Sequence, residues 1–246
     1  MAVHLLADVH LRDGKDPNAA RLIGYLAGRA RHAEAVYVLG DLFDVWVGDD
    51  GSIAPHAAVL DAFAELASHG VALYFMRGNR DFAVGEAFVS ASRLRILDDP
   101  CVVDLAGEPT LLSHGDIFCT DDTAHQAFRA RYTNPRWRAR MMRLPLWLRR
   151  RIARRARRRS QAGKQIKASQ LMDVNYDAVR QAMQAYGVRR LIHGHTHRPA
   201  THEVALPTCT GERIVLADWR PDQAEVLRID DRGIHRDSLI EAGGGS

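Results

Sequence analysis

The 246-residue sequence predicts a layered α/β sandwich. Short runs of Val, Leu and Ile alternate with longer helical segments in the first part of the chain, and this βαβα order is typical of helices packed on a sheet. Several runs are apolar at nearly every position, which indicates strands that are covered on both faces. The hydrophobic fraction of 46% is ordinary for a globular protein, and the length suffices for one large core.

The expected elements follow one another with recognisable boundaries. Pro17 suits the first turn of a helix, and Gly70 suits the end of another. Helices are therefore predicted at about 17–31 and 54–69. Core strands are predicted at 3–9, 36–39, 71–76, 101–105, 109–113 and 190–193. Further short runs look like a meander, for which we expect a second sheet packed on the first, at 202–205, 213–217, 223–229 and 233–236.

No strand pattern is visible from about 120 to 186, so we expect a mostly helical insertion within a single domain of residues 1–240. Residues 241–246 are expected to form a flexible, glycine-rich tail. The insertion is strongly basic, with sixteen Lys and Arg and no acidic residue between Arg129 and Lys167. The rest of the chain has 18 basic and 30 acidic residues, a net charge of −12. Charge of one sign confined to one element predicts a polyanionic partner, which can be membrane, nucleic acid or a phosphorylated ligand.

The composition argues against several classes of protein. No apolar stretch approaches the roughly 20 residues that span a bilayer. The N-terminus reaches Asp8 without a basic region, so it is predicted to be a buried strand and not a signal peptide. The cysteines Cys101, Cys119 and Cys209 are widely spaced and form no CxxC motif, so neither a disulfide framework nor a zinc knuckle is indicated. A reducing cytosolic compartment is therefore expected.

Five short signatures place metal-ligating side chains directly after predicted strands. They are Asp8-Val9-His10, Gly40-Asp41, Gly78-Asn79-Arg80-Asp81, His114-Gly115-Asp116 and Gly194-His195-Thr196-His197. An open α/β sheet gathers its chemistry at the carboxyl ends of its strands, so these residues are expected to converge. Seven O and N ligands are too many for one ordinary site and suit two divalent ions that share a carboxylate. The seven candidates are Asp8, His10, Asp41, Asn79, His114, His195 and His197.

Each signature taken alone has a simpler explanation. An Asp-x-His pair occurs in surface loops, and Gly-Asp is a common turn. His193 still lies within its predicted strand, so we expect a packed, hydrogen-bonded core histidine there and not a ligand. The joint occurrence of five signatures in one order makes a metal centre the better interpretation. A mixed set of oxygen and nitrogen ligands without thiolate admits Mn²⁺, Fe²⁺, Zn²⁺, Co²⁺ or Ni²⁺. Its many imidazole nitrogens argue against purely oxygen-coordinated Ca²⁺ or Mg²⁺.

The order D-x-H, GD, GN-x-D, HGD and GH-x-H resembles the calcineurin-like metallophosphoesterase superfamily over roughly residues 3–200. The resemblance implies a four-layer sandwich of two β-sheets flanked by helices, with a dinuclear metal centre at one edge. The residues that it implies for the first ion are Asp8, His10, Asp41 and His197. Those that it implies for the second ion, with Asp41 as the bridge, are Asp41, Asn79, His114 and His195.

Arg80 stands where the superfamily usually has a histidine that serves as general acid or transition-state stabiliser. Arginine is no useful proton donor near neutral pH, but it can bind phosphate oxygens through two N–H groups. The GNRD signature resembles the branch that hydrolyses UDP-2,3-diacylglucosamine to UMP and 2,3-diacylglucosamine 1-phosphate in lipid A biosynthesis. This resemblance implies two divalent ions, with Mn²⁺ favoured, and catalytic roles for Arg80, Asn79 and Asp41.

The same resemblance implies that the insertion is a lid that accommodates the acyl chains and contacts the substrate phosphate. It implies a peripheral enzyme at the cytoplasmic face of the inner membrane, which acts on a lipid-linked UDP-sugar and has no obligate protein partner. The residues that it implies for substrate binding are Asn79, Arg80, Asp122, Ser160, Lys164, Lys167 and His195.

The arginine-rich part of the insertion leaves two kinds of partner open. Eight arginines fall in the eleven positions from Arg149 to Arg159, too many for one solvated helix face, and like charges at i,i+4 destabilise a helix. The Met, Leu and Trp residues beside them suit an anionic membrane surface, which we favour. Trp137 and Trp147 could instead stack on bases, so a nuclease or phosphodiesterase acting on nucleic acid is the alternative. A non-enzymatic membrane-binding protein is disfavoured by the complete ligand set.

Overall fold

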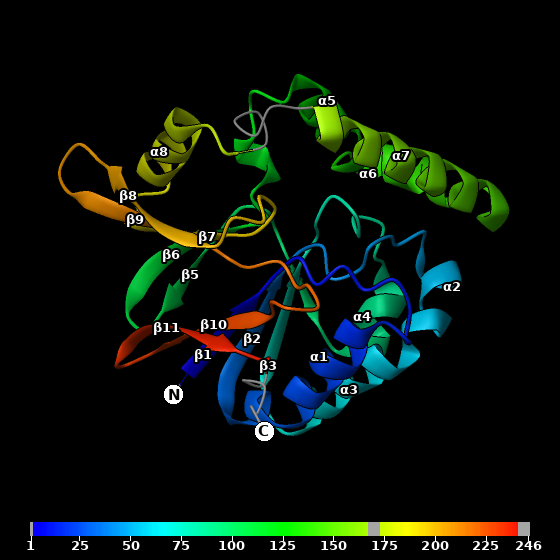
Figure 1. Cartoon of the computed structure of the whole chain (residues 1–246), viewed down its shortest axis with the longest axis horizontal. Helices are drawn as coiled ribbons and strands as arrows, with labels where there is room; N and C mark the ends of the chain where they lie inside the picture. Colours follow the sequence, from blue (N-terminus) through cyan, green and yellow to red (C-terminus); the bar gives the residue numbers. More distant parts are fainter. Residues whose placement is uncertain (1, 167–172, 241–246) are drawn as a thin grey trace.

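A computed structural model of the chain contains two β-sheets packed face to face, with helices on their outer faces (Figure 1). It describes residues 2–166 and 173–240, and for 159–166 it describes the helical backbone alone. The strand order is β11-β10-β1-β2-β3-β4 in the first sheet and β5-β6-β7-β9-β8 in the second. The predicted α/β sandwich of two mixed sheets is confirmed.

The first sheet is parallel at its centre and antiparallel at one edge. Its strands are β1 (Ala2–Leu6), β2 (Ala33–Leu39), β3 (Ala72–Met76), β4 (Arg95–Leu97), β10 (Glu225–Asp230) and β11 (Gly233–Ser238). Three helices cover its outer face, α1 (Pro17–Ala27), α3 (Ala57–Ser68) and α4 (Glu86–Ser92). Leu22, Phe63 and Phe88 of these helices join one apolar cluster with Val36 and Phe75 of the sheet.

The second sheet forms the third layer. Its strands are β5 (Cys101–Leu105), β6 (Glu108–Ser113), β7 (Arg190–His193), β8 (Ala200–Ala205) and β9 (Thr210–Val215). Leu112 and Ile192 of this sheet pack against Leu5 and Leu39 of the first, so the apolar layer between the sheets is buried from both sides. Helix α8 (Tyr176–Ala185) covers the outer face through Val179 and Met183, which completes a four-layer sandwich.

Some predicted elements differ from the structure in their extent or pairing. The second sheet predicted for the tail is present, but the prediction is wrong for the last two strands: β8 and β9 join the second sheet, whereas β10 pairs with β1 in the first. This pairing covers an edge of β1 that would otherwise be open. Strand β1 ends at Leu6, so the residues up to Val9 form a loop. The predicted helix over 17–31 ends at Ala27 and continues after Gly28 as a 3₁₀ turn, η1 (Arg29–His32).

Other helices also break into shorter pieces. The region predicted as a helix over 54–69 begins with a 3₁₀ turn, η2 (Ala54–His56), which follows α2 (Asp49–Ser52). Neither β4 nor α4 was predicted, because β4 has three residues and α4 has seven. Segments this short carry too few apolar positions to show a period.

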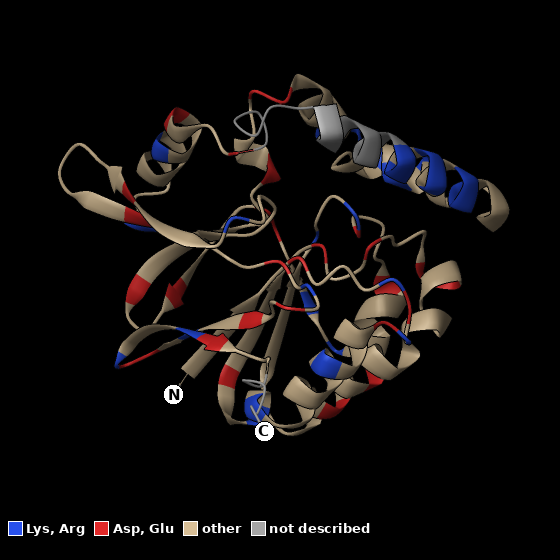
Figure 2. Ribbon diagram, viewed as in Figure 1, with Lys and Arg blue, Asp and Glu red and all other residues tan. Residues whose placement is uncertain are grey.

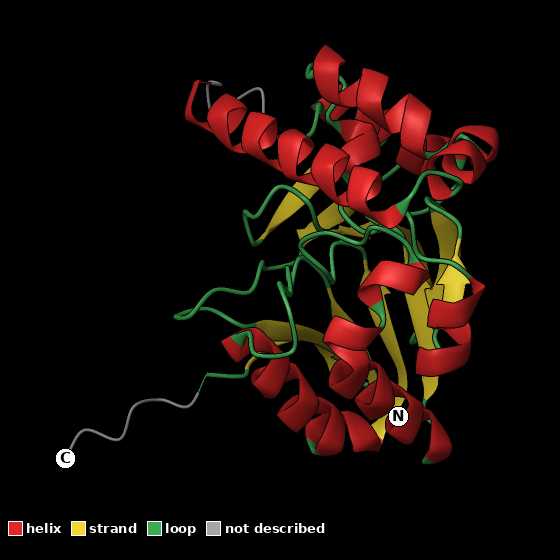
Figure 3. Cartoon of the chain, turned by 90° about the vertical axis from the view of Figure 1, so that its right-hand side faces the viewer, coloured by secondary structure: helices red, strands yellow, loops and turns green. Residues whose placement is uncertain are grey.

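Apart from its last helix, which covers the second sheet, the insertion lies over the loops at the carboxyl ends of β1, β2 and β3 (Figures 1 and 3). It begins after η3 (Asp116–Phe118) and contains α5 (Thr123–Tyr132), α6 (Pro135–Met142), α7 (Leu146–Ile166) and α8. Its described residues contain no strand. Lys and Arg residues gather along α7, whereas acidic residues are scattered over the body (Figure 2). Within the described ranges, no helix combines the length and the apolar character that a membrane span requires.

Candidate metal centre

The first group of candidate ligands joins the loop after β1 to the loop after β7. Asp8, His10 and His197 each place a ligand atom within 4.8 Å of the others. The two histidine Nε2 atoms lie 3.2 Å apart. Asp8 Oδ1 lies 3.8 Å from His10 Nε2 and 3.5 Å from His197 Nε2. One oxygen and two imidazole nitrogens therefore face a common point, as ligands of one cation would.

The second group adds the loops after β2, β3 and β6. Asp8, Asp41 and His114 also lie within 4.8 Å of one another through their ligand atoms. His114 Nε2 is 3.7 Å from Asp41 Oδ1 and 3.1 Å from Asn79 Oδ1. Asp8 is thus the carboxylate that belongs to both groups, whereas the family resemblance implies Asp41 as the bridge. His195 flanks the second group, with its ring centroid 5.1 Å from that of His114.

The backbone is strained at these positions. A positive φ is uncommon for residues other than glycine, and such strain concentrates at functional sites. Five of the seven predicted ligands nevertheless have a left-handed φ, namely Asp8 (53°), His10 (55°), Asp41 (52°), His195 (69°) and His197 (56°). The tight loops turn these side chains toward the centre immediately after each strand ends.

Two glycines in the signatures make room for the carboxylates. A Cβ atom at Gly78 would collide with Asp41 Oδ1, and one at Gly194 would collide with Asp8 Oδ2. Any larger residue at either position would push a carboxylate out of place. The glycines in GNRD and GHTH therefore serve close packing against the candidate ligands.

Other residues hold the ligands from behind. His114 Nδ1 lies 2.9 Å from the carbonyl oxygen of Leu39, and His197 Nδ1 lies 3.3 Å from Asp218 Oδ2. Both rings thereby direct Nε2 toward the centre, as supporting partners of metal-binding histidines do. Asp81, which is fully buried, accepts hydrogen bonds from the backbone N–H groups of Asp41 and Gly78 and so fixes two of the loops.

These supporting roles were not predicted from the sequence. Asp81 was visible as the last residue of GNRD, but the motif gave no sign of what it binds. Asp218 lies after β9, outside every signature, and only the fold brings it to His197.

The electrostatics of the centre fit a cation. Burial lowers the pKa of His197, but Asp218 and Asp8 outweigh it and raise the pKa to about 9. Burial also lowers the pKa of His114, and Asp41, Asp116 and Asp8 raise it to about 9. The carboxylates therefore create a strongly negative potential at both rings. Within the described part of the chain, Asp8 Oδ1 also lacks a hydrogen-bond partner although it is buried. Divalent cations would satisfy both features, with release of protons from the rings.

Arg80 lies at the rim of this centre. Its backbone N–H donates to Asp41 Oδ1 over 2.9 Å, and its guanidinium Nε is 3.9 Å from Asp41 Oδ2. Its Nη1 lies 3.5 Å from Asp44 Oδ1, and 16% of the side chain remains exposed. A planar cation in this position can bind the oxygens of a phosphoryl group that enters the centre.

The other predicted residues are less closely gathered. Asp122 caps α5 by accepting a hydrogen bond from the His125 backbone over 3.1 Å. His193 is buried beside Phe118, with Nδ1 2.8 Å from the Gly194 oxygen, and belongs to neither ligand group. Ser160 and Lys164 fall on α7 where side chains are not described, and Lys167 lies outside the described residues.

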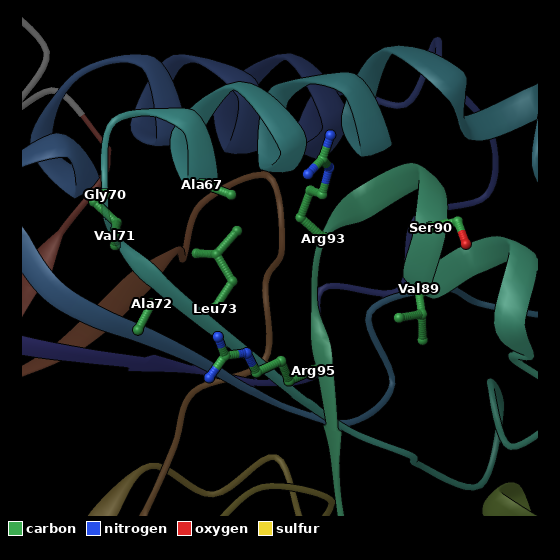
Figure 4. A pocket seen from close by; sticks show the side chains of 9 residues that line it. All are labelled: Ala67, Gly70, Val71, Ala72, Leu73, Val89, Ser90, Arg93 and Arg95. Atoms are coloured by element: carbon green, nitrogen blue, oxygen red, sulfur yellow. The ribbon is translucent and has the colours of Figure 1, made fainter.

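A groove on another part of the surface is separate from the metal centre (Figure 4). It has a volume of about 730 Å³ and lies between α3, β3 and α4, with Leu73 and Val89 on its apolar wall. Arg93 and Arg95 also line it. No predicted site residue lines this groove.

Comparison with known proteins agrees with this geometry. A calcineurin-like phosphoesterase family model matches residues 1–199. The chain is 48% identical over 219 residues to a UDP-2,3-diacylglucosamine hydrolase of Nitrosococcus oceani, and the aligned region covers 89% of this chain and 88% of the relative. Relatives of the same name from Aromatoleum aromaticum (44% identity, 95% of each chain) and Aeromonas hydrophila (46% identity, 92% and 94%) match similarly. The chain therefore belongs to the calcineurin-like phosphoesterase family, in its group of UDP-2,3-diacylglucosamine hydrolases.

Proposed function

We propose that this protein hydrolyses the pyrophosphate of UDP-2,3-diacylglucosamine to UMP and 2,3-diacylglucosamine 1-phosphate. The observation that carries the proposal is the convergence of two Asp–His groups that share Asp8, with Arg80 at their rim. The relatives named for this substrate match nearly the whole chain, including the insertion. The activity is that of a metal-dependent pyrophosphatase.

In this proposal, two divalent cations are held by the seven side chains predicted from the sequence, and Mn²⁺ is the favoured ion. When bound, the cations supply Lewis acidity at phosphoryl oxygens and activate the attacking water. The resemblance implies attack at the α-phosphorus, in line with the leaving phosphate. The leaving group is itself a phosphate, so the reaction does not require a general acid from the protein.

The role of Arg80 follows from its position and its chemistry. Its guanidinium neutralises the charge that develops on the phosphoryl oxygens during attack, and the paired N–H groups orient the group being transferred. Asn79 presents its amide beside His114 and helps to orient the same phosphoryl group. Asp41 would help to hold the cations, and the hydrogen bond that it accepts from the Arg80 backbone N–H sets its orientation.

The insertion serves the lipid part of the substrate in this proposal. Trp147 is 64% exposed and Ile152 is 38% exposed on the arginine-rich helix α7, which suits contact with acyl chains and anionic head groups. Such a surface supports our proposal of peripheral binding at the cytoplasmic face of the inner membrane. The polar contacts to the substrate are assigned to Asp122, Ser160, Lys164 and Lys167.

Product analysis tests the proposal. Purified protein with Mn²⁺, detergent and UDP-2,3-diacylglucosamine should release UMP and the diacylglucosamine 1-phosphate in phosphorus NMR spectra, and Asp41→Ala should release neither. Cleavage of single-stranded nucleic acid, with steep salt dependence of binding and no cleavage of the lipid nucleotide, would replace this function with the nuclease alternative.

A further inference from the structure

One buried carboxylate beside the metal centre belongs to neither ligand group. Asp116 is the last residue of the HGD signature and is fully buried in η3. Its Oδ1 accepts a hydrogen bond from Arg129 Nε over 3.0 Å. Its Oδ2 lies 3.1 Å from His125 Nε2 and also accepts a hydrogen bond from the Tyr132 hydroxyl. The Asp116 carboxylate therefore contacts three side chains at once.

These three partners all come from helix α5. His125, Arg129 and Tyr132 are separated by four and three positions, so they share one face of the helix. That face is turned toward η3, and the helix is the first of the insertion. Burial and the Asp116 carboxylate raise the pKa of Tyr132 above its ordinary value, which keeps the hydroxyl proton in place as a donor.

Arg129 extends the network to a second carboxylate. Its Nη2 lies 2.9 Å from Asp99 Oδ2, and only 14% of its side chain is exposed. Asp99 Oδ1 in turn accepts hydrogen bonds from Ser113 Oγ over 2.7 Å and from the backbone N–H of His114 over 3.1 Å. The guanidinium thus spans from helix α5 to the segment that carries a candidate ligand.

Aromatic packing on the same face also supports this helix. Phe82, which follows the GNRD signature, stacks on Tyr132 with ring centroids 5.1 Å apart and meets Phe128 edge-on at 6.0 Å. Helix α5 is therefore held at both the loop after β3 and the loop after β6. This places the His125 ring 5.1 Å from the ring of His195, measured between centroids.

We propose that Asp116 and Arg129 are positioning residues that lock α5 against the metal centre as a fixed wall of the substrate site. The lock sets the place of His125 beside His195, and of the α5 N-terminus with Asp122. This lock should affect the binding of the part of the substrate beyond the reacting phosphorus, and should leave the metal centre unchanged. The effect on turnover rests on the proposed function, whereas the effect on the helix does not.

The test compares Arg129→Met with Arg131→Met, which removes the same charge from an exposed position of the same helix. In Arg129→Met, backbone hydrogen exchange over 123–132 should accelerate by about tenfold or more, because the helix loses its buried anchor. Asp99 keeps its hydrogen bonds to Ser113 and His114, so Mn²⁺ affinity measured by calorimetry should stay the same. Arg131→Met should resemble the wild type in both measurements.

Two substrates then separate positioning from general damage. For Arg129→Met, kcat/KM toward UDP-2,3-diacylglucosamine should fall by about a hundredfold, since misplaced substrate contacts slow turnover strongly. Hydrolysis of bis(4-nitrophenyl) phosphate, which needs the metal centre alone, should be unchanged. Arg129→Lys, which can pair with one of the two carboxylates, should recover part of the loss.

Two results would overturn the inference. One is unchanged hydrogen exchange over 123–132 in both Arg129→Met and Tyr132→Phe. The other is a parallel fall in Mn²⁺ affinity and in hydrolysis of both substrates, which would mean that the network supports the metal centre itself. If the wild type does not cleave the lipid nucleotide, the proposed function fails, and the exchange and calorimetry results still decide the role of Arg129.

Discussion

His10 and His197 place their Nε2 atoms 3.2 Å apart, although 187 positions separate them in the sequence. Two protonated rings would repel each other at this distance, whereas two neutral rings can share a cation. Asp8 Oδ1 faces both nitrogens and lacks a hydrogen-bond partner within the described residues. The fold therefore brings three candidate ligands of one cation together from two distant parts of the chain.

Cation binding should stabilise the protein through this contact. At a free Mn²⁺ concentration of a hundred times the Kd, the free energy of unfolding should rise by about 2.7 kcal/mol. Thermal unfolding with and without Mn²⁺ measures the effect. His197→Ala should lose most of the increase, whereas His202→Ala, on the exposed part of β8, should keep it. An equal Mn²⁺ effect in both variants would show that the ion binds elsewhere.

Replacement of Arg80 should affect turnover more than metal binding. Arg80→Lys keeps the charge but loses the paired N–H groups that fit a phosphoryl group, so kcat should fall by about a hundredfold. Calorimetry should give the same Mn²⁺ affinity as the wild type, since no ligand atom is removed. A kcat close to that of the wild type would show that Arg80 contributes its positive charge alone and that its paired N–H groups are not needed.

Much of the metal centre could be predicted because it depends on local sequence. Each ligand follows a buried strand, and parallel strands bring their carboxyl ends together within a sheet, so the signatures after β1, β2 and β3 and those after β6 and β7 were each expected to gather. The packing of the two sheets then brings the two sets together. The contribution of Asp218 could not be predicted, because its contact with His197 depends on how the loop after β9 folds back. The sequence also could not show which sheet each tail strand joins, because this depends on which sheet edges are open. The apolar pattern of a strand carries no information about its pairing partner.

The contacts of the basic insertion also could not be predicted from the sequence. The sequence indicates how many arginines it contains but not which of them turn inward. Arg129 reaches Asp99 and Asp116, Arg149 is only 6% exposed, and Arg157 pairs with Asp44 beside the metal centre. These arginines serve the protein itself, so the surface available to an anionic partner is smaller than the charge count suggests.

Arg149 should contribute to stability. Its Nε donates to the carbonyl oxygen of Leu144 over 2.9 Å, and its Nη1 donates to the carbonyl oxygen of Val47, so it ties α7 to the loop before α2. Arg149→Met should lower the free energy of unfolding by about 2–3 kcal/mol, because the half-buried carbonyl acceptors of Leu144 and Val47 lose a buried charged donor. Arg150→Met, at an exposed position, should change it by less than about 0.5 kcal/mol. Urea denaturation compares the two variants, and equal stabilities would contradict the inward role of Arg149.

His56 should make stability depend on pH. It is 3% exposed, its ring lies 4.6 Å from that of Phe43, and burial lowers its pKa to about 4. The unfolded chain takes up this proton near its ordinary pKa of 6.5, so the unfolded state binds more protons between pH 6.5 and pH 4. Stability from His56 is therefore present above pH 6.5 and lost as the pH falls toward 4.

Urea denaturation at pH 7 and pH 4.5 measures this contribution. His56→Phe, which keeps an aromatic ring beside Phe43, should reduce the loss of stability between the two pH values by an amount on the order of 2 kcal/mol. His32→Phe changes an exposed histidine and should leave the loss as in the wild type. The same pH dependence in all three proteins would exclude His56 as its source.

The most direct test of the two-cation hydrolysis follows the oxygen atom that enters the product. Wild-type protein with Mn²⁺ and UDP-2,3-diacylglucosamine in ¹⁸O-labelled water should yield UMP that carries one ¹⁸O atom, seen as an isotope-shifted phosphorus resonance. The 2,3-diacylglucosamine 1-phosphate should carry none, and Asp41→Ala should form neither product. Label in the lipid phosphate, or products formed equally well by Asp41→Ala, would contradict water attack at the α-phosphorus within this metal centre.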